Sequence, residues 1–431
     1  MVAPIDPQVT TTALGNGLRV TTVELPHLHT AVVSVFIKVG ARFESEADSG
    51  LSHFVEHMLF RGNAQHPTSL ALNTAFESLG SSLHAETGRD YTLFQIGTAP
   101  DDVVAALELF GQFLGAPRFA DIELERALVL EEINEDYSEE DIEINADDIA
   151  RGLVFPGHPL GQRIIGPRVN VQRFSLEDVR RHFGRFYGAR NMTLCVAGPV
   201  KHDSIAVACS RYLGDMHGGE VSEPQSAPPS VVGPVLHTVR DSGSQTSVCV
   251  LLRGVGELDP GYLGFVALSR LLDDGMSTRL HYQLADQKGL AYSIGAGIEP
   301  LVDTALLDIV GATANDKVPE LVRELLSLLS GLRQGVIADD ELAKARARYR
   351  YETLASVDDA AAMAAWFSGT ALYYPPVPLS RRLAQIEAVT LTDVQAAAQR
   401  VLVPDNLVVA AVGALTRSRQ RDLRQVIRDW K

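Results

Sequence analysis

The chain contains an internal repeat that spans most of its 431 residues. Three segments of the first half recur in the same order in the second half: 30–44, 83–114 and 176–200 correspond to 246–259, 292–329 and 391–415. Each repeat combines strand-like apolar runs with amphipathic helical stretches. The sequence therefore predicts an α+β fold of two homologous domains, each with a mainly antiparallel sheet backed by helices.

A stretch rich in Gly, Pro and Ser separates the two repeats over residues 216–234. Such a composition is typical of a linker. We therefore expect an N-terminal domain over 1–215 and a homologous C-terminal domain over 235–431. This division agrees with the length of the chain, which is too great for one ordinary hydrophobic core.

Local patterns predict the elements of the first domain. Apolar and β-branched residues predict a hairpin of strands over 18–23 and 31–39, and a strand pair within 82–96. Helical periodicity predicts helices over 69–79, 101–114 and 175–186. It also predicts one helical stretch of about thirty residues that starts at Ile122.

One segment of the first domain, GLSHFVEHMLFRG, places three polar side chains within a predicted helix. Helical spacing puts His53, Glu56 and His57 on one face, and Asp48 or Ser49 is the expected N-cap. Two imidazoles one turn apart suit zinc, and a carboxylate beside them suits a general base that activates water. The order His-x-x-Glu-His is the inverzincin signature.

A catalytic zinc needs a third protein ligand. The segment LEEINED offers Glu131 and Glu132, and the sequence alone leaves the choice between them open. The alternative is that His53 and His57 are ordinary, partly buried histidines.

Composition excludes several classes of partner. The net charge of −16 and the absence of a basic run argue against nucleic acid. Cys195, Cys209 and Cys249 are odd in number and widely spaced, so we expect reduced core thiols. No leader-like segment and no window of eighteen apolar residues is present, so we expect no membrane partner and a cytoplasmic location. A periplasmic or organellar location after processing stays open.

The chain resembles the M16 metallopeptidases over nearly its whole length. The resemblance rests on LGNGLRV, His-x-x-Glu-His, LVLEEI, HPLGQRIIG, ARNMTLCVAGPV and GLAYS. It implies that His53, His57 and Glu132 bind one zinc ion, that Glu56 activates water and that Glu125 orients the site. It also implies that two short subunits close around a peptide.

The chain departs from the family pattern in its second half. The family usually carries an Arg and a Tyr seven residues apart, which hold substrate carbonyls opposite the zinc. Here Tyr292 is present, but Ala285 replaces the arginine. Either a related subunit supplies the Arg and Tyr in a heterodimer, which we favour, or Lys288 or another donor replaces the arginine in a homodimer. His84 stands where the family tends to have a substrate-binding Asn.

The resemblance implies a zinc metalloendopeptidase that hydrolyses peptides or unfolded segments inside a chamber formed by two subunits. A non-catalytic structural or assembly subunit on the same fold is the alternative. A peptidase that processes targeting presequences is a further possibility.

Overall fold

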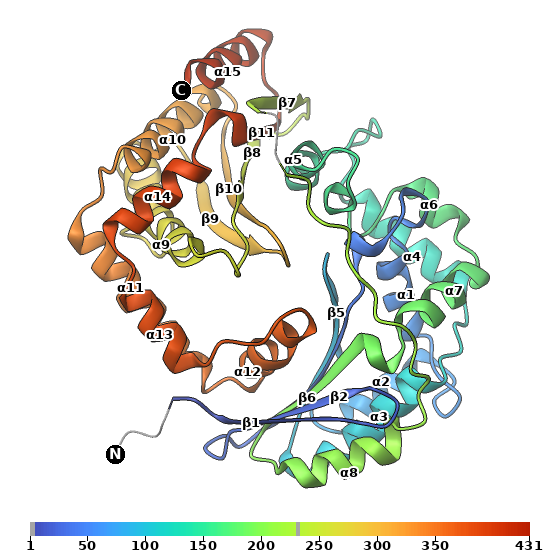
Figure 1. Cartoon of the computed structure of the whole chain (residues 1–431). Coiled ribbons are helices and arrows are strands. Elements are labelled where there is room, and N and C mark those ends of the chain that lie inside the picture. Colours follow the sequence, from blue (N-terminus) through green and yellow to red (C-terminus); the bar gives the residue numbers. More distant parts are fainter. Residues whose placement is uncertain (1–4, 230–232) are drawn as a thin grey trace. The chain divides into compact units, whose positions relative to one another are not determined.

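The computed structural model describes residues 5–229 and 233–431, which divide into two compact units (Figure 1). The first unit contains residues up to 133 together with 163–225 and 352–382. The second unit contains 134–162, the described residues of 226–351, and 383–431. The division after residue 225 falls within the predicted linker. However, residues 134–162 of the first half belong to the second unit, and residues 352–382 of the second half belong to the first unit.

A six-stranded sheet forms the centre of the first unit. Its strands, in spatial order, are β1 (Gln8–Ala13), β2 (Arg19–Glu24), β6 (Met192–Gly198), β3 (Ala31–Ile37), β5 (Thr92–Thr98) and β4 (His84–Thr87). The pair β2 and β6 is parallel, and the other neighbours are antiparallel. The shortest strand, β4, therefore lies at one edge of the sheet.

Helices cover both faces of this first sheet. The helices of the unit are α1 (Leu51–Leu59), α2 (Ser69–Glu77), α3 (Val103–Gly115), α4 (Ile122–Asn134), α6 (Arg168–Arg173), α7 (Leu176–Phe186), α8 (His202–Leu213) and α12 (Ala360–Ala364). Successive residues of a strand point to opposite faces. Thus Leu93 joins a buried cluster with Met363 of α12, while the ring of Phe94 lies 5.2 Å from that of Phe113 in α3.

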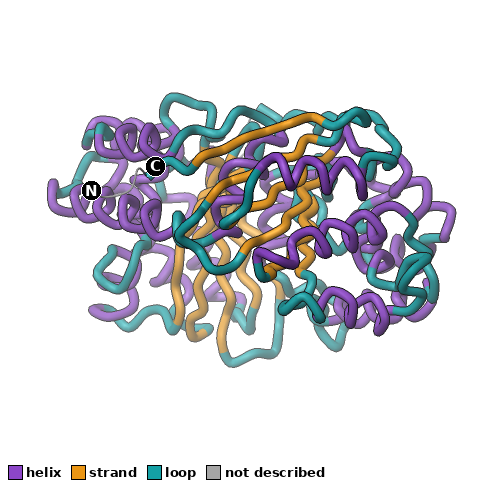
Figure 2. The backbone as a smooth tube through the Cα atoms, turned by 90° about the horizontal axis from the view of Figure 1, so that it is seen from below, coloured by secondary structure: helices purple, strands orange, loops and turns teal. Residues whose placement is uncertain are grey.

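A five-stranded sheet forms the centre of the second unit. Its strands, in spatial order, are β7 (Val235–Val239), β11 (Leu407–Val412), β8 (Gln245–Gly254), β10 (Ala305–Ala314) and β9 (Ser293–Pro300). One face packs against α9 (Tyr262–Leu272), α10 (Val318–Arg333), α14 (Leu391–Val401) and α15 (Arg417–Asp429). The other face packs against α5 (Ala146–Val154). Figure 2 shows the strands of the whole chain in orange and the helices in purple.

The two sheets share one topology. The order β2-β6-β3-β5-β4 in the first sheet corresponds strand by strand to β7-β11-β8-β10-β9 in the second. In both sheets the first of these pairs is parallel and the remaining pairs are antiparallel. The prediction of a repeated α+β architecture is confirmed. Strand β1 is additional to the first sheet.

Two local predictions were wrong. The strands over 18–23 and 31–39 do not form a hairpin, because β6 lies between β2 and β3. The helical stretch from Ile122 ends at Asn134 and resumes only at Ala146. Asp141 between them has a positive φ of 59°, and Asn145 caps the new helix by accepting hydrogen bonds from two backbone N–H groups.

Two further α-helices, α11 (Asp339–Ser356) and α13 (Leu379–Glu387), each cross a boundary between the units. Among the described residues, no helix combines the length and the apolar character needed to cross a bilayer.

Candidate metal centre

Helix α1 carries His53, Glu56 and His57, as the sequence predicts. Its apolar residues are buried, and the helix contacts α7 and the edge strand β4. The predicted N-cap at Asp48 or Ser49 was wrong, because the helix begins after Gly50, whose φ is +94°. Only glycine adopts this conformation without strain.

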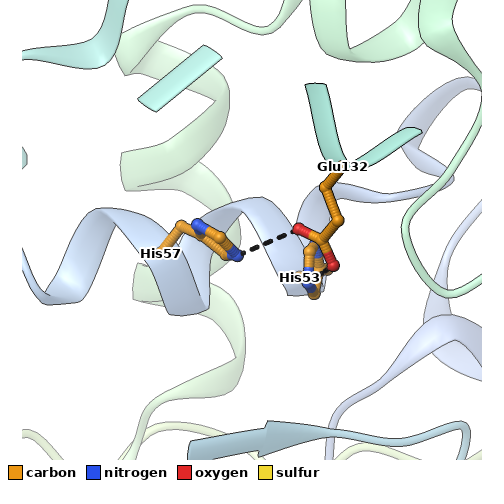
Figure 3. A group of neighbouring side chains, drawn as sticks. All are labelled: His53, His57 and Glu132. Atoms are coloured by element: carbon orange, nitrogen blue, oxygen red, sulfur yellow. Dashed lines mark ion pairs between the residues drawn. The ribbon is translucent and has the colours of Figure 1, made fainter. Parts of the chain in front are cut away.

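Glu132 of α4 reaches the two histidines from the side. Its Oε1 lies 3.6 Å from Nε2 of His53, and its Oε2 lies 3.6 Å from Nε2 of His57 (Figure 3). The neighbouring candidate, Glu131, is not part of this group. The structure therefore brings together His53, His57 and Glu132 from two helices.

This set of side chains fits a zinc ion. Two imidazoles and one carboxylate are typical ligands of catalytic zinc, and one coordination position then remains open. Zinc bonds of roughly 2.0–2.1 Å place neighbouring ligand atoms of a tetrahedron roughly 3.3–3.4 Å apart. For comparison, each oxygen of Glu132 lies 3.6 Å from the Nε2 atom of a different histidine, and one ligand atom from each of the three residues lies within 4.8 Å of the other two.

The two histidines differ in how their rings are held. The Nδ1 atom of His57 lies 3.1 Å from Oε2 of Glu125, which is 6% exposed and also forms an ion pair with Arg61. Burial lowers the pKa of His57, but the hydrogen bond and the charge of Glu125, with the nearby carboxylates, raise it overall. In contrast, Nδ1 of His53 has no hydrogen-bond partner among the described residues.

Burial, together with the nearby His57, lowers the pKa of His53 to about 3. Its ring is therefore neutral near pH 7. A neutral imidazole keeps the lone pair that a metal ion requires.

Glu56 is fixed by a residue that the sequence analysis missed. The hydroxyl of Thr87, at the end of β4, donates a hydrogen bond to Oε2 of Glu56. Burial raises the pKa of Glu56, while the hydrogen bond from Thr87 acts in the opposite direction. Thr87 is separated from the motif by 31 positions in the sequence, so no local pattern could reveal this pairing.

The remaining predicted site residues, His84 and Tyr292, belong to different units. His84 is an exposed residue of the edge strand β4 in the first unit. Tyr292 precedes β9 in the second unit and is 85% exposed. Ala285 packs, partly buried, against the core of that unit, and Lys288 forms an ion pair with Glu324.

A second group of potential ligand atoms lies between α5 and the second sheet. It consists of Asp147, Cys249 and Asp308, with Sγ of Cys249 3.7 Å from Asp308 and 4.0 Å from Asp147. However, one nitrogen of Arg151 lies 2.9 Å from each oxygen of Asp147, and Arg151 also pairs with Glu299. This arrangement is an ionic cluster that attaches α5 to the sheet.

Residues 19–168 match the family model of insulinase, peptidase family M16, and residues 173–349 match the model of the peptidase M16 inactive domain. An uncharacterized zinc protease of Mycobacterium leprae is 27% identical over 397 residues, which cover 91% of this chain and 88% of that protein. A probable mitochondrial-processing peptidase subunit beta of Schizosaccharomyces pombe is 26% identical over 432 residues, with 95% and 92% covered.

A solved structure has the same fold. The crystal structure of a protease from Helicobacter pylori matches with a TM-score of 0.86 at 21% identity, and covers 95% of this chain and 100% of that chain. The resemblance drawn from the sequence motifs is confirmed by these matches. The chain therefore belongs to peptidase family M16.

Proposed function

We propose that the chain is a zinc-dependent endopeptidase that hydrolyses peptides or unfolded segments. The observation that carries this proposal is the convergence of His53, His57 and Glu132, from two helices, on the same side of α1 as Glu56. The relative from Mycobacterium leprae, which is named a zinc protease, supports the same function.

Each residue has a distinct role in the proposal. His53, His57 and Glu132 hold the zinc ion, and Glu125 orients His57. A zinc ion in such a site supplies Lewis-acid chemistry, because it polarises a peptide carbonyl and acidifies a water molecule.

Glu56 is the general base in this scheme. Burial raises its pKa above that of an exposed glutamate, which makes its carboxylate a better proton acceptor. The same group then passes the proton to the leaving amine. The hydrogen bond from Thr87 holds the carboxylate in one orientation while the proton is transferred.

The edge strand β4 is the proposed place for the substrate backbone. An extended peptide can add to an exposed strand edge through main-chain hydrogen bonds, which carry affinity without strong sequence preference. Thr87, the last residue of β4, is bonded to Glu56, so a peptide on this edge would pass close to the general base. His84, exposed at the other end of β4, would contact this peptide.

A second M16-type subunit is the proposed partner. Ala285 stands at the position of the family arginine, and its methyl side chain cannot donate a hydrogen bond. Lys288, the other candidate donor, forms an ion pair with Glu324. An Arg and a Tyr from another subunit would then act opposite the zinc in a closed chamber. The alternative is a homodimer that uses its own Tyr292. The relative named subunit beta supports a subunit role.

Basic peptides are a second candidate substrate class. The relative from Schizosaccharomyces pombe is named a mitochondrial-processing peptidase, and this chain carries a net charge of −16. If such peptides are preferred, cleavage of Arg-rich peptides will be faster and will fall steeply with salt. Equal rates for acidic and basic peptides would remove this candidate.

The test is hydrolysis of a quenched fluorescent peptide by the zinc-loaded chain, together with zinc content. Glu56→Gln should keep zinc and lose turnover, and a chelator should abolish activity. Glu132→Gln should lose zinc, whereas Glu131→Gln, the matched control one position away, should keep it. Activity without zinc, or full activity of Glu56→Gln, would refute the peptidase mechanism.

Zinc binding without hydrolysis by the chain alone would point to a missing subunit. If adding candidate M16 subunits then restored no cleavage, the chain would be a structural or assembly subunit instead.

A further inference from the structure

The buried carboxylate of Glu44 holds the start of the metal-binding helix. Glu44 is 4% exposed and follows a short 3-10 turn over Ala41–Phe43. Its Oε2 accepts a hydrogen bond of 2.8 Å from the backbone N–H of Gly50, and its Oε1 accepts one of 2.6 Å from that of Ser52. One carboxylate thus satisfies two of the N–H groups that a helix leaves without intrahelical partners.

Helix α1 needs this distant carboxylate because its own N-cap position has no side chain. Most N-caps are Ser, Thr, Asp or Asn, whose side-chain oxygen accepts from the first turn. At Gly50 the φ of +94° disfavours such residues, and a Cβ atom would lie 2.5 Å from the carbonyl oxygen of Ile165. The geometry that requires glycine therefore removes the usual cap, and Glu44 takes its place.

The position of His53 depends on this backbone. His57 is oriented by Glu125, whereas Nδ1 of His53 has no hydrogen-bond partner among the described residues. Ser52, whose N–H is bound to Glu44, directly precedes His53 in the chain. The Ser52 hydroxyl is itself 3.2 Å from Nε2 of the buried His182. The backbone immediately before His53 is thus held from two sides.

We propose that Glu44 is a positioning residue of the metal centre, which sets the place of His53 by fixing the first turn of α1. The inference rests on the proposed zinc site. It adds that the affinity and geometry of that site depend on a carboxylate outside the group of His53, His57 and Glu132. Removing a group that hydrogen-bonds directly to a metal ligand typically changes metal affinity by about 10- to 100-fold, and this range sets the upper limit for a group, such as Glu44, that acts through the backbone.

The test compares Glu44→Gln and Glu44→Ala with the unaltered chain. Glutamine keeps one acceptor oxygen but turns an NH₂ group toward the second N–H, and alanine removes both acceptors. The pKa of Glu44 is raised to about 8 because the effect of burial exceeds the opposite effect of its hydrogen bonds with Ser52 and Gly50. Binding should therefore be measured above pH 8, where the carboxylate is ionised in the unaltered chain.

Zinc affinity is measured by competition with a chelator, and site geometry by the visible absorption spectrum of the cobalt-substituted chain. We expect affinity to fall about 10-fold in Glu44→Gln and up to about 100-fold in Glu44→Ala, with an altered cobalt spectrum in both. Thr390→Ala is the matched control, because Thr390 caps α14 in the second unit through a side-chain acceptor. It should lower the melting temperature and leave zinc affinity and the cobalt spectrum unchanged.

The outcomes separate this inference from the proposed function. If the unaltered chain binds no zinc, the proposed function fails. If the unaltered chain binds zinc and folded Glu44→Gln binds it equally well with the same cobalt spectrum, the role of Glu44 is refuted. Circular dichroism establishes that each variant is folded, and Glu44→Gln decides the result if Glu44→Ala does not fold.

Discussion

The Nδ1 atom of His57 lies 3.1 Å from Oε2 of Glu125, and the other oxygen of Glu125 is 2.5 Å from Nε of Arg61. This hydrogen bond directs Nε2 of His57 toward Glu132. Arg61 forms an ion pair with the buried Glu125, so that its charge balances the carboxylate that accepts from the imidazole. Glu125 and Glu132 are seven residues apart, and both lie within α4. One helix therefore supplies a metal-ligand candidate and the group that orients another.

Replacing Glu125 with Gln should weaken zinc binding by about 10- to 100-fold, because His57 loses a charged hydrogen-bond partner. Competition with a chelator measures this change. Glu123→Gln is the control, since Glu123 is exposed on the same helix and pairs with Arg126. Equal zinc affinities for the two variants would show that Glu125 does not orient the site.

The sequence predicted most elements of the fold because their signals are local. Helical periodicity located α2, α3 and α7, and β4 and β5 form the expected strand pair. In contrast, packing between distant segments decides which strands are neighbours. The hairpin prediction failed because β6, which lies more than 150 residues after β3 in the sequence, is placed between β2 and β3. The break after α4 did have a local signal, because Asn145 precedes two aspartates in a typical N-cap pattern.

The sequence identified residues that the structure brings together where they share one helix turn or match a family motif. His53, Glu56 and His57 follow from helical spacing, and Glu132 required the resemblance to M16 peptidases. Thr87 and Glu44 act on this helix from other elements, so spacing within the motif carries no signal for them.

Replacing Thr87 with Val should lower kcat by about 10-fold, because Glu56 loses the hydroxyl that holds its carboxylate in one orientation for proton transfer. Zinc affinity should not change, since Thr87 contacts the proposed base and not the ligands. Peptide hydrolysis at saturating substrate measures kcat, and Thr87→Ser should retain most of it. Unchanged kcat in Thr87→Val would show that Glu56 does not need this contact.

Tyr292 provides a test of the second unit in catalysis. Because its side chain is 85% exposed, Tyr292→Phe should change the free energy of unfolding by less than about 0.5 kcal/mol. If the hydroxyl binds substrate in the assembled enzyme, kcat/KM should fall at least about 10-fold. Tyr282→Phe, another exposed tyrosine of the same unit, is the control. An equal kcat/KM for both variants and the unaltered chain would exclude Tyr292 from the reaction.

The ionic cluster beneath α5 should make stability depend on pH. Burial and the charge of Asp147 raise the pKa of Asp308 from 3.8 to about 6. The folded state therefore binds the proton of Asp308 more tightly than the unfolded state does. The stabilisation from this proton is fully present below pH 3.8 and is lost as the pH rises through about 6.

Asp308→Asn should remove this dependence, because an amide does not titrate in that range. Urea unfolding of the chelator-treated chain at several pH values measures how the free energy of unfolding depends on pH. Between pH 3.8 and a pH above 6, the unaltered chain should lose about 1 to 2 kcal/mol of unfolding free energy relative to Asp308→Asn. Asp286→Asn, at an exposed position of the same unit, should follow the unaltered chain. Parallel curves for Asp308→Asn and the unaltered chain would mean that Asp308 titrates at the same pH in the folded and unfolded states.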